Sequence, residues 1–206
     1  MKRAQGEANK LQRRKDILDA ARILVSERGP DAWRLEEVSS QLGLAKGTLY
    51  LYFPTRYDML AALLREELEL WRASFEESGA EAALTQGLTA RPLLVRLMTS
   101  LHMSIEAGLG GAGLLELKSW LAEFLRSSAA HLEKLVPALA GSGERFMLEY
   151  YALVVGAAQL AYPPDRVAQL VADRGELSVF RIELGAFLDD ALRALLAGYA
   201  ATRAPH

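Results

Sequence analysis

The sequence predicts an all-α protein of about nine or ten helices, and three observations lead to this prediction. Almost every long segment carries apolar residues at the helical period, and no pair of segments alternates convincingly as strands. The composition, with 51% hydrophobic and 24% charged residues, is ordinary for a soluble globular protein. Residues 144–162 are apolar nearly all round, which is typical of a helix buried against several neighbours.

The expected helices follow from the positions of apolar stripes and of Gly and Pro. The first spans about residues 9–28 and ends at Gly29-Pro30. The next two, at 35–42 and 44–53, are joined by a tight turn at Gly43, and Pro54 ends the second. The remaining elements are a helix at 56–77, a loop at 78–90, a helix at 91–107, a flexible connection at 108–113, and helices at 114–135, 144–162, 165–172 and 176–199. Residues 1–55 and 56–206 are the expected domains.

Composition excludes several classes of protein. The absence of cysteine excludes disulfides, thiolate metal sites and a thiol redox sensor. The polar, basic first sixteen residues contain no signal-peptide core, and the most apolar stretch is shorter than the roughly 18–20 residues that span a bilayer. We expect a cytoplasmic protein with no membrane partner.

Charge is unevenly distributed. Residues 1–60 hold eleven Lys and Arg against eight Asp and Glu, whereas the remainder holds thirteen against eighteen. Lys10, Arg13, Arg14 and Lys15 form the densest basic cluster. This end of the chain suggests a polyanionic partner, although a solvated helix start explains the cluster equally well.

Two short helices joined by a glycine turn and preceded by a basic helix match a helix-turn-helix unit. On a helical wheel Leu49 and Phe53 fall on one side of the second short helix, and Gly47 and Leu51 fall opposite, with hydroxyl groups beside them. A glycine here costs about 1 kcal/mol of helix propensity, which is understandable if a side chain would collide with DNA in the major groove. The alternative is a glycine-weakened core helix.

The segments "GLAKGTLYLYFPTRYDML" and "ILDAARILVSERGPDAWRLEEVSSQLG" resemble the signature of the tetracycline-repressor (TetR) family of transcription regulators. The resemblance covers about residues 13–60. It implies an N-terminal three-helix DNA-binding domain and a larger C-terminal helical domain for ligand binding and dimerisation. It also implies a ligand-responsive regulator, acting as a repressor, whose recognition helix lies at about 45–52.

The resemblance carries DNA-contact roles onto matching positions. Lys46, Tyr52 and Arg56 match positions that contact phosphates. Gly47 matches the position where the helix backbone approaches DNA closely, and Thr48 and Tyr50 match positions that contact the groove. Three positions depart from the family pattern: Arg34 replaces a hydroxyl helix cap, Ala45 replaces Ser, and Leu51 stands where an aromatic is common. We expect Leu51 either to contact a thymine methyl group or to contact no base. The expected DNA-binding residues are Arg34, Ala45, Lys46, Gly47, Thr48, Tyr50, Leu51, Tyr52 and Arg56.

An apolar cavity with a few polar side chains is expected in the larger domain, for a small apolar or amphipathic effector. Six of its residues lie in pairs one turn apart on three helices, with Gln159 further along the third helix, and plain core residues share this spacing. His102 is the candidate polar group and His131 is expected to be exposed. The candidate ligand-binding residues are Met98, His102, Trp120, Phe124, Met147, Tyr151 and Gln159.

A homodimer is expected because the helix at 144–162 combines apolar and small residues, and the last helix offers a second stripe. Two such helices from each chain form a four-helix bundle, and a C2 dimer places two recognition helices on a palindromic operator. The candidate interface residues are Ala152, Gly156, Ala157, Phe180, Leu184, Phe187, Leu188, Ala191 and Leu195.

Two other functions are alternatives to a DNA-binding regulator. A di-metal helical enzyme needs Glu-x-x-His pairs, and neither His102 nor His131 has a Glu three residues before it. No Ser lies in a G-x-S-x-G motif, so we expect no catalytic residue, metal or cofactor. A helical carrier or interaction module that binds an apolar ligand without DNA is the alternative, which the basic first helix and residues 46–52 disfavour.

Overall fold

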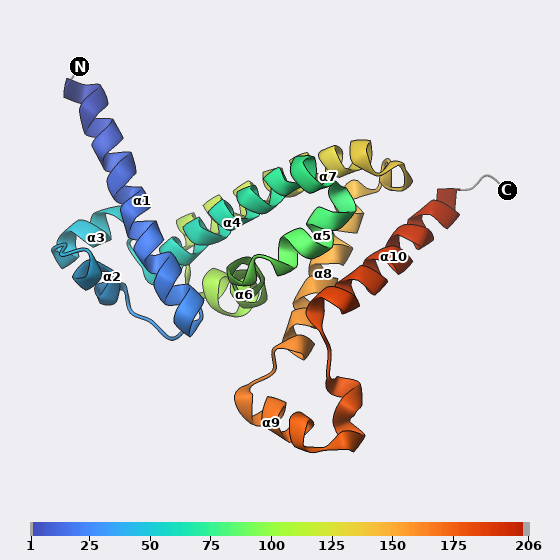
Figure 1. Ribbon diagram of the computed structural model, residues 1–206. Helices are drawn as coiled ribbons and strands as arrows, with labels where there is room; N and C mark the ends of the chain where they lie inside the picture. Colours follow the sequence, from blue (N-terminus) through green and yellow to red (C-terminus); the bar gives the residue numbers. More distant parts are fainter. Residues whose placement is uncertain (1, 204–206) are drawn as a thin grey trace. The chain divides into compact units, whose positions relative to one another are not determined.

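The computed structural model describes residues 2–203, and no strand occurs among them (Figure 1). The all-α fold class predicted from the sequence is confirmed. The helices are α1 (Lys2–Arg28), α2 (Leu35–Gln41), α3 (Lys46–Tyr52), α4 (Arg56–Ser78), α5 (Ala80–Thr89), α6 (Pro92–Ser100), the π-helical η1 (Leu101–Glu106), α7 (Gly111–Leu135), the 3-10 turn η2 (Pro137–Leu139), α8 (Gly143–Ala161), α9 (Asp165–Asp173), the 3-10 segment η3 (Gly175–Phe180) and α10 (Leu184–Arg203).

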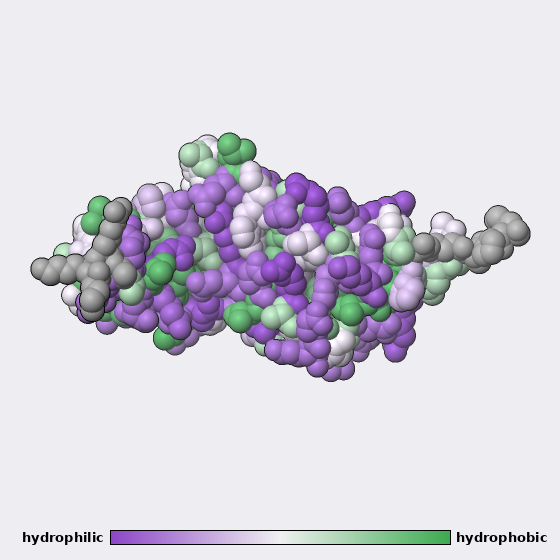
Figure 2. Space-filling model, turned by 90° about the horizontal axis from the view of Figure 1, so that it is seen from above, coloured by the Kyte–Doolittle hydropathy of each residue, from purple (hydrophilic) through white to green (hydrophobic). Residues whose placement is uncertain are grey.

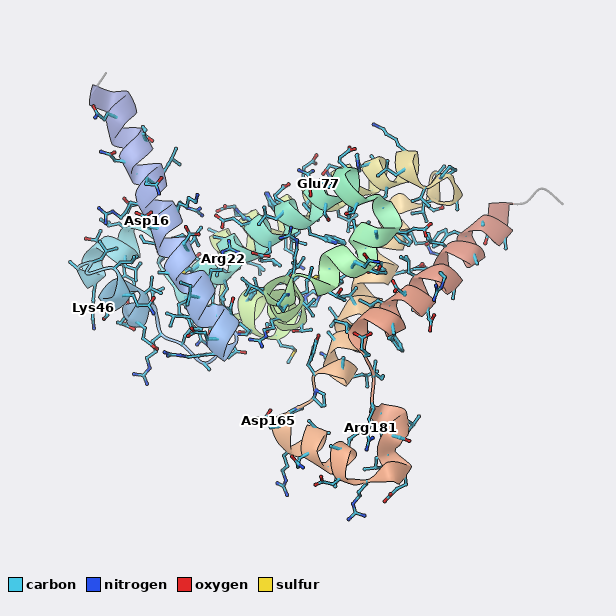
Figure 3. All side chains as sticks on the ribbon, viewed as in Figure 1. Asp16, Arg22, Lys46, Glu77, Asp165 and Arg181 are labelled. Atoms are coloured by element: carbon cyan, nitrogen blue, oxygen red, sulfur yellow. The ribbon has the colours of Figure 1, made fainter. Side chains whose placement is uncertain are left out.

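The chain forms two compact units, and α4, α6 and α7 each contribute residues to both. The first unit comprises residues up to 68 together with 96–117. Its core is built by the apolar stripe of α1, including Ile17 and Leu24, against Val38 of α2 and Leu49 of α3. Arg22 extends from α1 to α4, where it pairs with Glu66 and the buried Glu67 (Figure 3).

The second unit comprises residues 69–95 and those from 118 onward. α10 packs against α5, α8 and η2. Tyr150 of α8 is buried, stacks on Phe146 and donates its hydroxyl to the Leu84 carbonyl of α5. Trp71 donates its indole N–H to the Ala83 carbonyl at 2.8 Å. These two long-range hydrogen bonds fix α5 in the core.

Four expectations about helix positions were wrong. The predicted loop at 78–90 is helix α5, which buries Ala83, Leu84 and Leu88. The predicted helix at 176–199 is interrupted after η3, because Glu183 accepts hydrogen bonds from the Gly185 and Ala186 amides and starts α10 there. The first helix begins at Lys2 rather than near residue 9, and α7 begins within the glycine run, at Gly111.

The surface carries few large apolar areas in the view of Figure 2, where green patches are small and separated by hydrophilic side chains. No residue of α9 or η3 is buried. Among the described residues, no helix has the length and apolarity required to cross a membrane. In the same part of the chain, no group of three or more His, Cys, Asp or Glu residues is placed to hold a metal ion.

Candidate nucleic-acid interface

The turn between α2 and α3 depends on Gly43, whose φ of 62° lies in the left-handed region. Residues with a side chain rarely adopt this conformation, so the glycine is required by the backbone. The Leu44 amide then donates to the Ser39 carbonyl at 2.9 Å, which closes the turn. The tight turn joins α2 directly to α3, as in a helix-turn-helix unit.

α2 begins without a side-chain cap, as expected from Arg34 at the capping position. Its first turn is stabilised instead by Glu37, whose carboxylate accepts a hydrogen bond from the Arg34 amide at 3.0 Å. Glu37 also pairs with Arg28 at the end of α1. Arg28 and the Arg34 amide together lower the pKa of the Glu37 carboxyl group, Arg28 having the larger effect. The Arg34 side chain remains exposed.

The inner face of α3 is apolar. Leu49 and Phe53 are buried, as the helical wheel predicts. The guanidinium of Arg14 lies 5.0 Å from the ring centre of Phe53, so one member of the basic cluster of α1 lies beside the end of α3. Lys10, Arg13 and Lys15 are exposed.

The outer face of α3 is open. Ala45, Lys46 and Gly47 are exposed, and a Cβ atom built on Gly47 meets no atom within 4 Å. Lys46 projects from the start of α3 (Figure 3). Leu51 is 84% exposed, the environment in which an apolar side chain gains least.

The three hydroxyl-bearing residues of α3 differ in their surroundings. Thr48 and Tyr52 are half-buried on the flanks of the helix. Tyr50 is 43% exposed and donates its hydroxyl to Glu36 Oε1 of α2 at 3.0 Å. This hydrogen bond raises the pKa of Tyr50.

Arg56 takes part in contacts within the chain. Its guanidinium donates to the Asp31 carbonyl and to the Tyr57 hydroxyl, each at 3.1 Å, and lies 4.8 Å from the centre of the Tyr57 ring. The Asp31 carboxylate also accepts a hydrogen bond from Ser104 of η1 at 2.6 Å. Arg56 therefore holds the loop between α1 and α2, a structural role that the sequence did not indicate.

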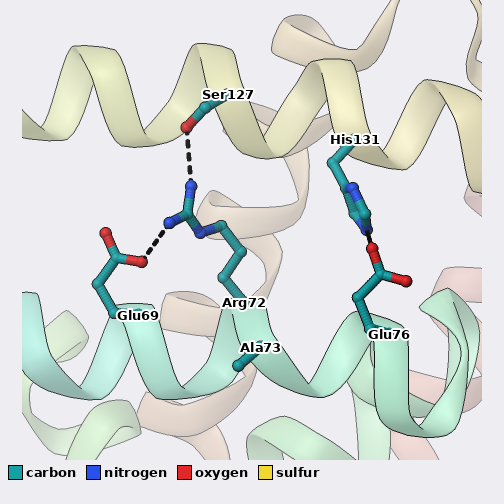
Figure 4. A pocket seen from close by; sticks show the side chains of 6 residues that line it. All are labelled: Glu69, Arg72, Ala73, Glu76, Ser127 and His131. Atoms are coloured by element: carbon teal, nitrogen blue, oxygen red, sulfur yellow. Dashed lines mark hydrogen bonds and ion pairs between the residues drawn. The ribbon is translucent and has the colours of Figure 1, made fainter.

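The second unit has a groove of about 300 Å³ between α4 and α7 (Figure 4). Arg72 reaches across it, donating to Ser127 Oγ at 3.1 Å and to the Glu69 carboxylate. His131 Nε2 lies 3.1 Å from Glu76 Oε1, an ion pair when the imidazole is protonated.

Aromatic rings lie behind these polar groups. The Arg72 guanidinium is 5.6 Å from the centre of the Phe124 ring, and His131 stacks on Phe75 with ring centres 6.3 Å apart. His131 is half-buried rather than exposed, because it packs against this ring. The groove itself is lined by Glu69, Arg72, Ala73, Glu76, Ser127 and His131, and the two phenylalanine rings are buried behind these side chains.

None of the residues that line the groove was among the expected effector-binding residues. Glu69, Arg72 and Glu76 share one face of α4, but charged residues at this spacing are common on solvated helices. Only the fold brings them opposite Ser127 and His131, more than 50 positions away in the sequence.

The expected effector residues are dispersed. Met98 and His102 belong to the first unit, and the other five to the second. His102 is exposed and lies 3.0 Å from Glu106 Oε2. Trp120 and Phe124 stack with ring centres 5.2 Å apart. Met98 and Met147 are buried, Tyr151 is half-buried, and Gln159 is exposed.

The expected interface residues divide between the core and the surface. Ala157, Leu184 and Leu188 face inward, because they are buried within their own chain. Accessible surface remains at Ala152, Gly156, Phe187, Ala191 and Leu195. Phe180 lies in η3, outside the final helix, and is 55% exposed.

Comparisons with known proteins agree with this architecture. Residues 17–63 match the family model of bacterial regulatory proteins of the tetR family, and residues 55–203 match the tetracyclin repressor-like C-terminal domain. The chain belongs to the TetR family. Proteins of this family are DNA-binding transcription regulators and not enzymes.

Curated relatives and a solved structure are consistent with this assignment. The chain is 35% identical over 92 residues to the fatty acid metabolism regulator protein of Bacillus subtilis, covering 45% of this chain and 44% of that protein. It is 30% identical over 108 residues to the transcriptional repressor KstR of Mycobacterium tuberculosis, covering 47% and 49%. The chain thus spans about half the length of the curated relatives it matches.

The fold is shared with a crystal structure of a TetR-family transcriptional regulator from Pectobacterium atrosepticum. The TM-score is 0.57 at 18% identity, over 93% of this chain and 96% of the other. The TetR fold thus extends over nearly the whole chain.

Proposed function

We propose that this TetR-family chain is a dimeric repressor that binds a palindromic operator through α3 and is released by a small amphipathic molecule. The outer face of α3 is the observation that carries the proposal. Lys46 is exposed there, and the open space above Gly47 permits close approach of DNA to the helix backbone. Residues 1–55 serve as the DNA-binding head, and residues 56–206 serve effector binding and dimerisation.

The basic part of α1 supports phosphate binding. Lys10, Arg13 and Lys15 are exposed, and Arg14 lies against Phe53 at the end of α3. Cationic side chains beside a recognition helix position it on the duplex by contacting phosphates, without reading sequence.

A dimer is supported by the accessible small residues of α8. Ala152 and Gly156 lie one turn apart and are exposed, and a Cβ atom at Gly156 meets nothing within 4 Å in its own chain. Small residues permit close approach of a partner helix, and α10 supplies Phe187, Ala191 and Leu195 to the same four-helix bundle. Gly156→Arg is expected to leave the protomer folded but to produce monomers in sedimentation experiments, and a dimer of unchanged affinity would contradict this assignment.

An amphipathic effector is supported by the groove between α4 and α7. Arg72 offers a cationic partner for an anionic head group, as does His131 when its imidazole is protonated, and the aliphatic parts of the lining side chains offer apolar contact. The relative from Bacillus subtilis is named as a regulator of fatty acid metabolism, which agrees with a lipid-like effector. We expect a medium-chain fatty acid used as a probe to release the operator, and Arg72→Gln to require more of it.

Operator binding is tested by gel-shift titration on the DNA upstream of the chain's own gene at several salt concentrations. Binding through phosphates weakens steeply with salt, and the steepness falls by about one for each phosphate that the protein no longer neutralises. Lys46→Ala should therefore flatten the slope, whereas Lys134→Ala, an exposed lysine of the second unit, should not. Binding that is absent or insensitive to salt would refute the proposal.

A further inference from the structure

The hydrogen bond between Tyr50 and Glu36 links the two helices of the helix-turn-helix unit at its surface. The Tyr50 hydroxyl lies 3.0 Å from Glu36 Oε1, and the Tyr50 side chain is exposed. Glu36 lies in the first turn of α2 and is half-buried. Both groups are therefore fixed relative to each other while remaining accessible from solvent.

The direction of the shared proton follows from the chemistry of the pair. A hydrogen bond with the backbone of its own residue lowers the pKa of Glu36, and the bond from Tyr50 lowers it further. The bond with Glu36 raises the pKa of Tyr50. At neutral pH the pair is thus a carboxylate and a neutral phenol. A carboxylate only accepts hydrogen bonds, so the single phenol proton is directed at Glu36.

We infer that Glu36, by accepting the hydrogen bond of the Tyr50 hydroxyl, turns this part of the interface into a surface that only accepts further hydrogen bonds and selects a base with an exocyclic amino group. This inference rests on the proposed placement of α3 in the major groove. A free phenol both donates and accepts, and it can pair with any base edge. With its proton directed at Glu36, the Tyr50 oxygen is complementary to adenine N6 or cytosine N4, the two major-groove amino donors. Guanine and thymine present acceptors at the corresponding positions and are disfavoured.

Neighbouring cations make the carboxylate compatible with DNA. Lys46 and Arg34 both favour the ionised form of Glu36 and lower its pKa. Both side chains are exposed at the proposed interface and offset the repulsion between Glu36 and phosphates. Glu36 is therefore a positioning residue, which acts on base recognition through Tyr50.

The test compares the base preference of full-length variants on a randomised operator library. The wild type should enrich adenine or cytosine at one symmetric pair of positions. Tyr50→Phe should lose the preference at these positions, and Glu36→Ala should relax it to include guanine and thymine. Tyr162→Phe, a change at an exposed tyrosine of the second unit, serves as the matched control and should keep the wild-type preference.

Base analogues identify the atom that is read. Removing the amino group, with purine in place of adenine or 2-pyrimidinone in place of cytosine, should weaken wild-type binding about tenfold and leave Tyr50→Phe unaffected. Where the base is adenine, an operator containing 7-deazaadenine should bind the protein with normal affinity, because the amino group of this analogue is intact.

Four outcomes overturn the inference. Weaker binding with 7-deazaadenine would show that Tyr50 donates its proton to N7. An unchanged preference in Glu36→Ala would show that Glu36 does not direct the phenol. Equal base selection by the wild type and by Tyr50→Phe would refute the inference alone, because operator binding would remain. A wild-type protein that selects no sequence would refute the proposed function as well.

Discussion

Replacing Gly47 by alanine should raise the stability of the protein while weakening its binding to the operator. In the free chain the added methyl group meets no atom within 4 Å, and Gly47 has no positive φ that would resist a side chain. Alanine also restricts the unfolded chain more than glycine does. The structure therefore offers no reason for glycine at this position of α3 other than close approach of DNA.

The magnitudes follow from the position of Gly47 in the helix. A glycine-to-alanine change in a helix interior stabilises by about 0.5–1 kcal/mol. Gly47 is the second residue of α3, so the gain should be near the lower limit, about 0.5 kcal/mol. For a protein of this size this raises the melting temperature by about 1–2 °C. On DNA the methyl group occupies the space of the close contact, and we expect operator affinity to fall at least tenfold, about 1.4 kcal/mol.

The assay measures melting temperature and operator affinity on the same preparations at one protein concentration. Gly198→Ala is the matched control, because Gly198 also lies within a helix with open space around its Cβ position. It should stabilise the protein without changing operator affinity. Undiminished operator affinity in Gly47→Ala would refute the close approach of this helix, and a lower melting temperature would contradict the open environment of Gly47.

Four further changes test individual contacts. Tyr150→Phe should lower the free energy of unfolding in urea by about 1 kcal/mol without changing operator affinity, since it removes one buried hydrogen bond to Leu84 and keeps the stacked ring. Arg56→Ala should reduce both the melting temperature and operator affinity, because it releases the Asp31 loop; a flatter salt slope at unchanged stability would assign Arg56 to phosphate binding alone. Hydrogen bonds from Arg145 and, to a lesser extent, from Tyr199 lower the pKa of the Glu149 carboxyl group. The ionised carboxylate therefore stabilises the fold at any pH above its ordinary pKa, and this stabilisation is lost as the pH falls through the lowered pKa. Glu149→Gln should therefore lose less stability than the wild type between neutral and acid pH, measured as the free energy of unfolding at both pH values. Leu51→Ala should abolish any difference between operators carrying thymine and uracil at the facing base; a difference that persists would exclude the thymine methyl contact.

The helix-turn-helix unit could be predicted because its determinants are local. Gly43 supplies the positive φ of the turn, and Leu49 and Phe53 supply the buried face at helical spacing. The boundaries of α3 accordingly differ from the expected ones by no more than two residues. Short-range signals of this kind survive in almost any tertiary context.

Helix α5 could not be predicted from its own residues, because distant groups define it. Its segment is rich in Ala, Gly and Thr, which resembles a loop. Trp71 and Tyr150 provide the hydrogen bonds and the apolar surface that hold it. The groove was missed for the same reason, since Arg72 and Ser127 are 55 positions apart. In both cases tertiary contacts outweigh local propensity.

The exposed groups of α3, taken together, favour one base pair over the others. Within a major groove an A·T pair presents both an adenine amino group and a thymine methyl group, whereas a C·G pair presents an amino group but no methyl group. The surface of Tyr50 and Glu36 accepts from either amino group and cannot distinguish the two pairs by itself. Leu51, 84% exposed beside Tyr50 in the sequence, gains apolar contact only from thymine. If both residues face the same base pair, the hydrogen bond to the amino group excludes the reversed orientation of the pair and the apolar contact excludes C·G, so that position of the half-site should be an A·T pair.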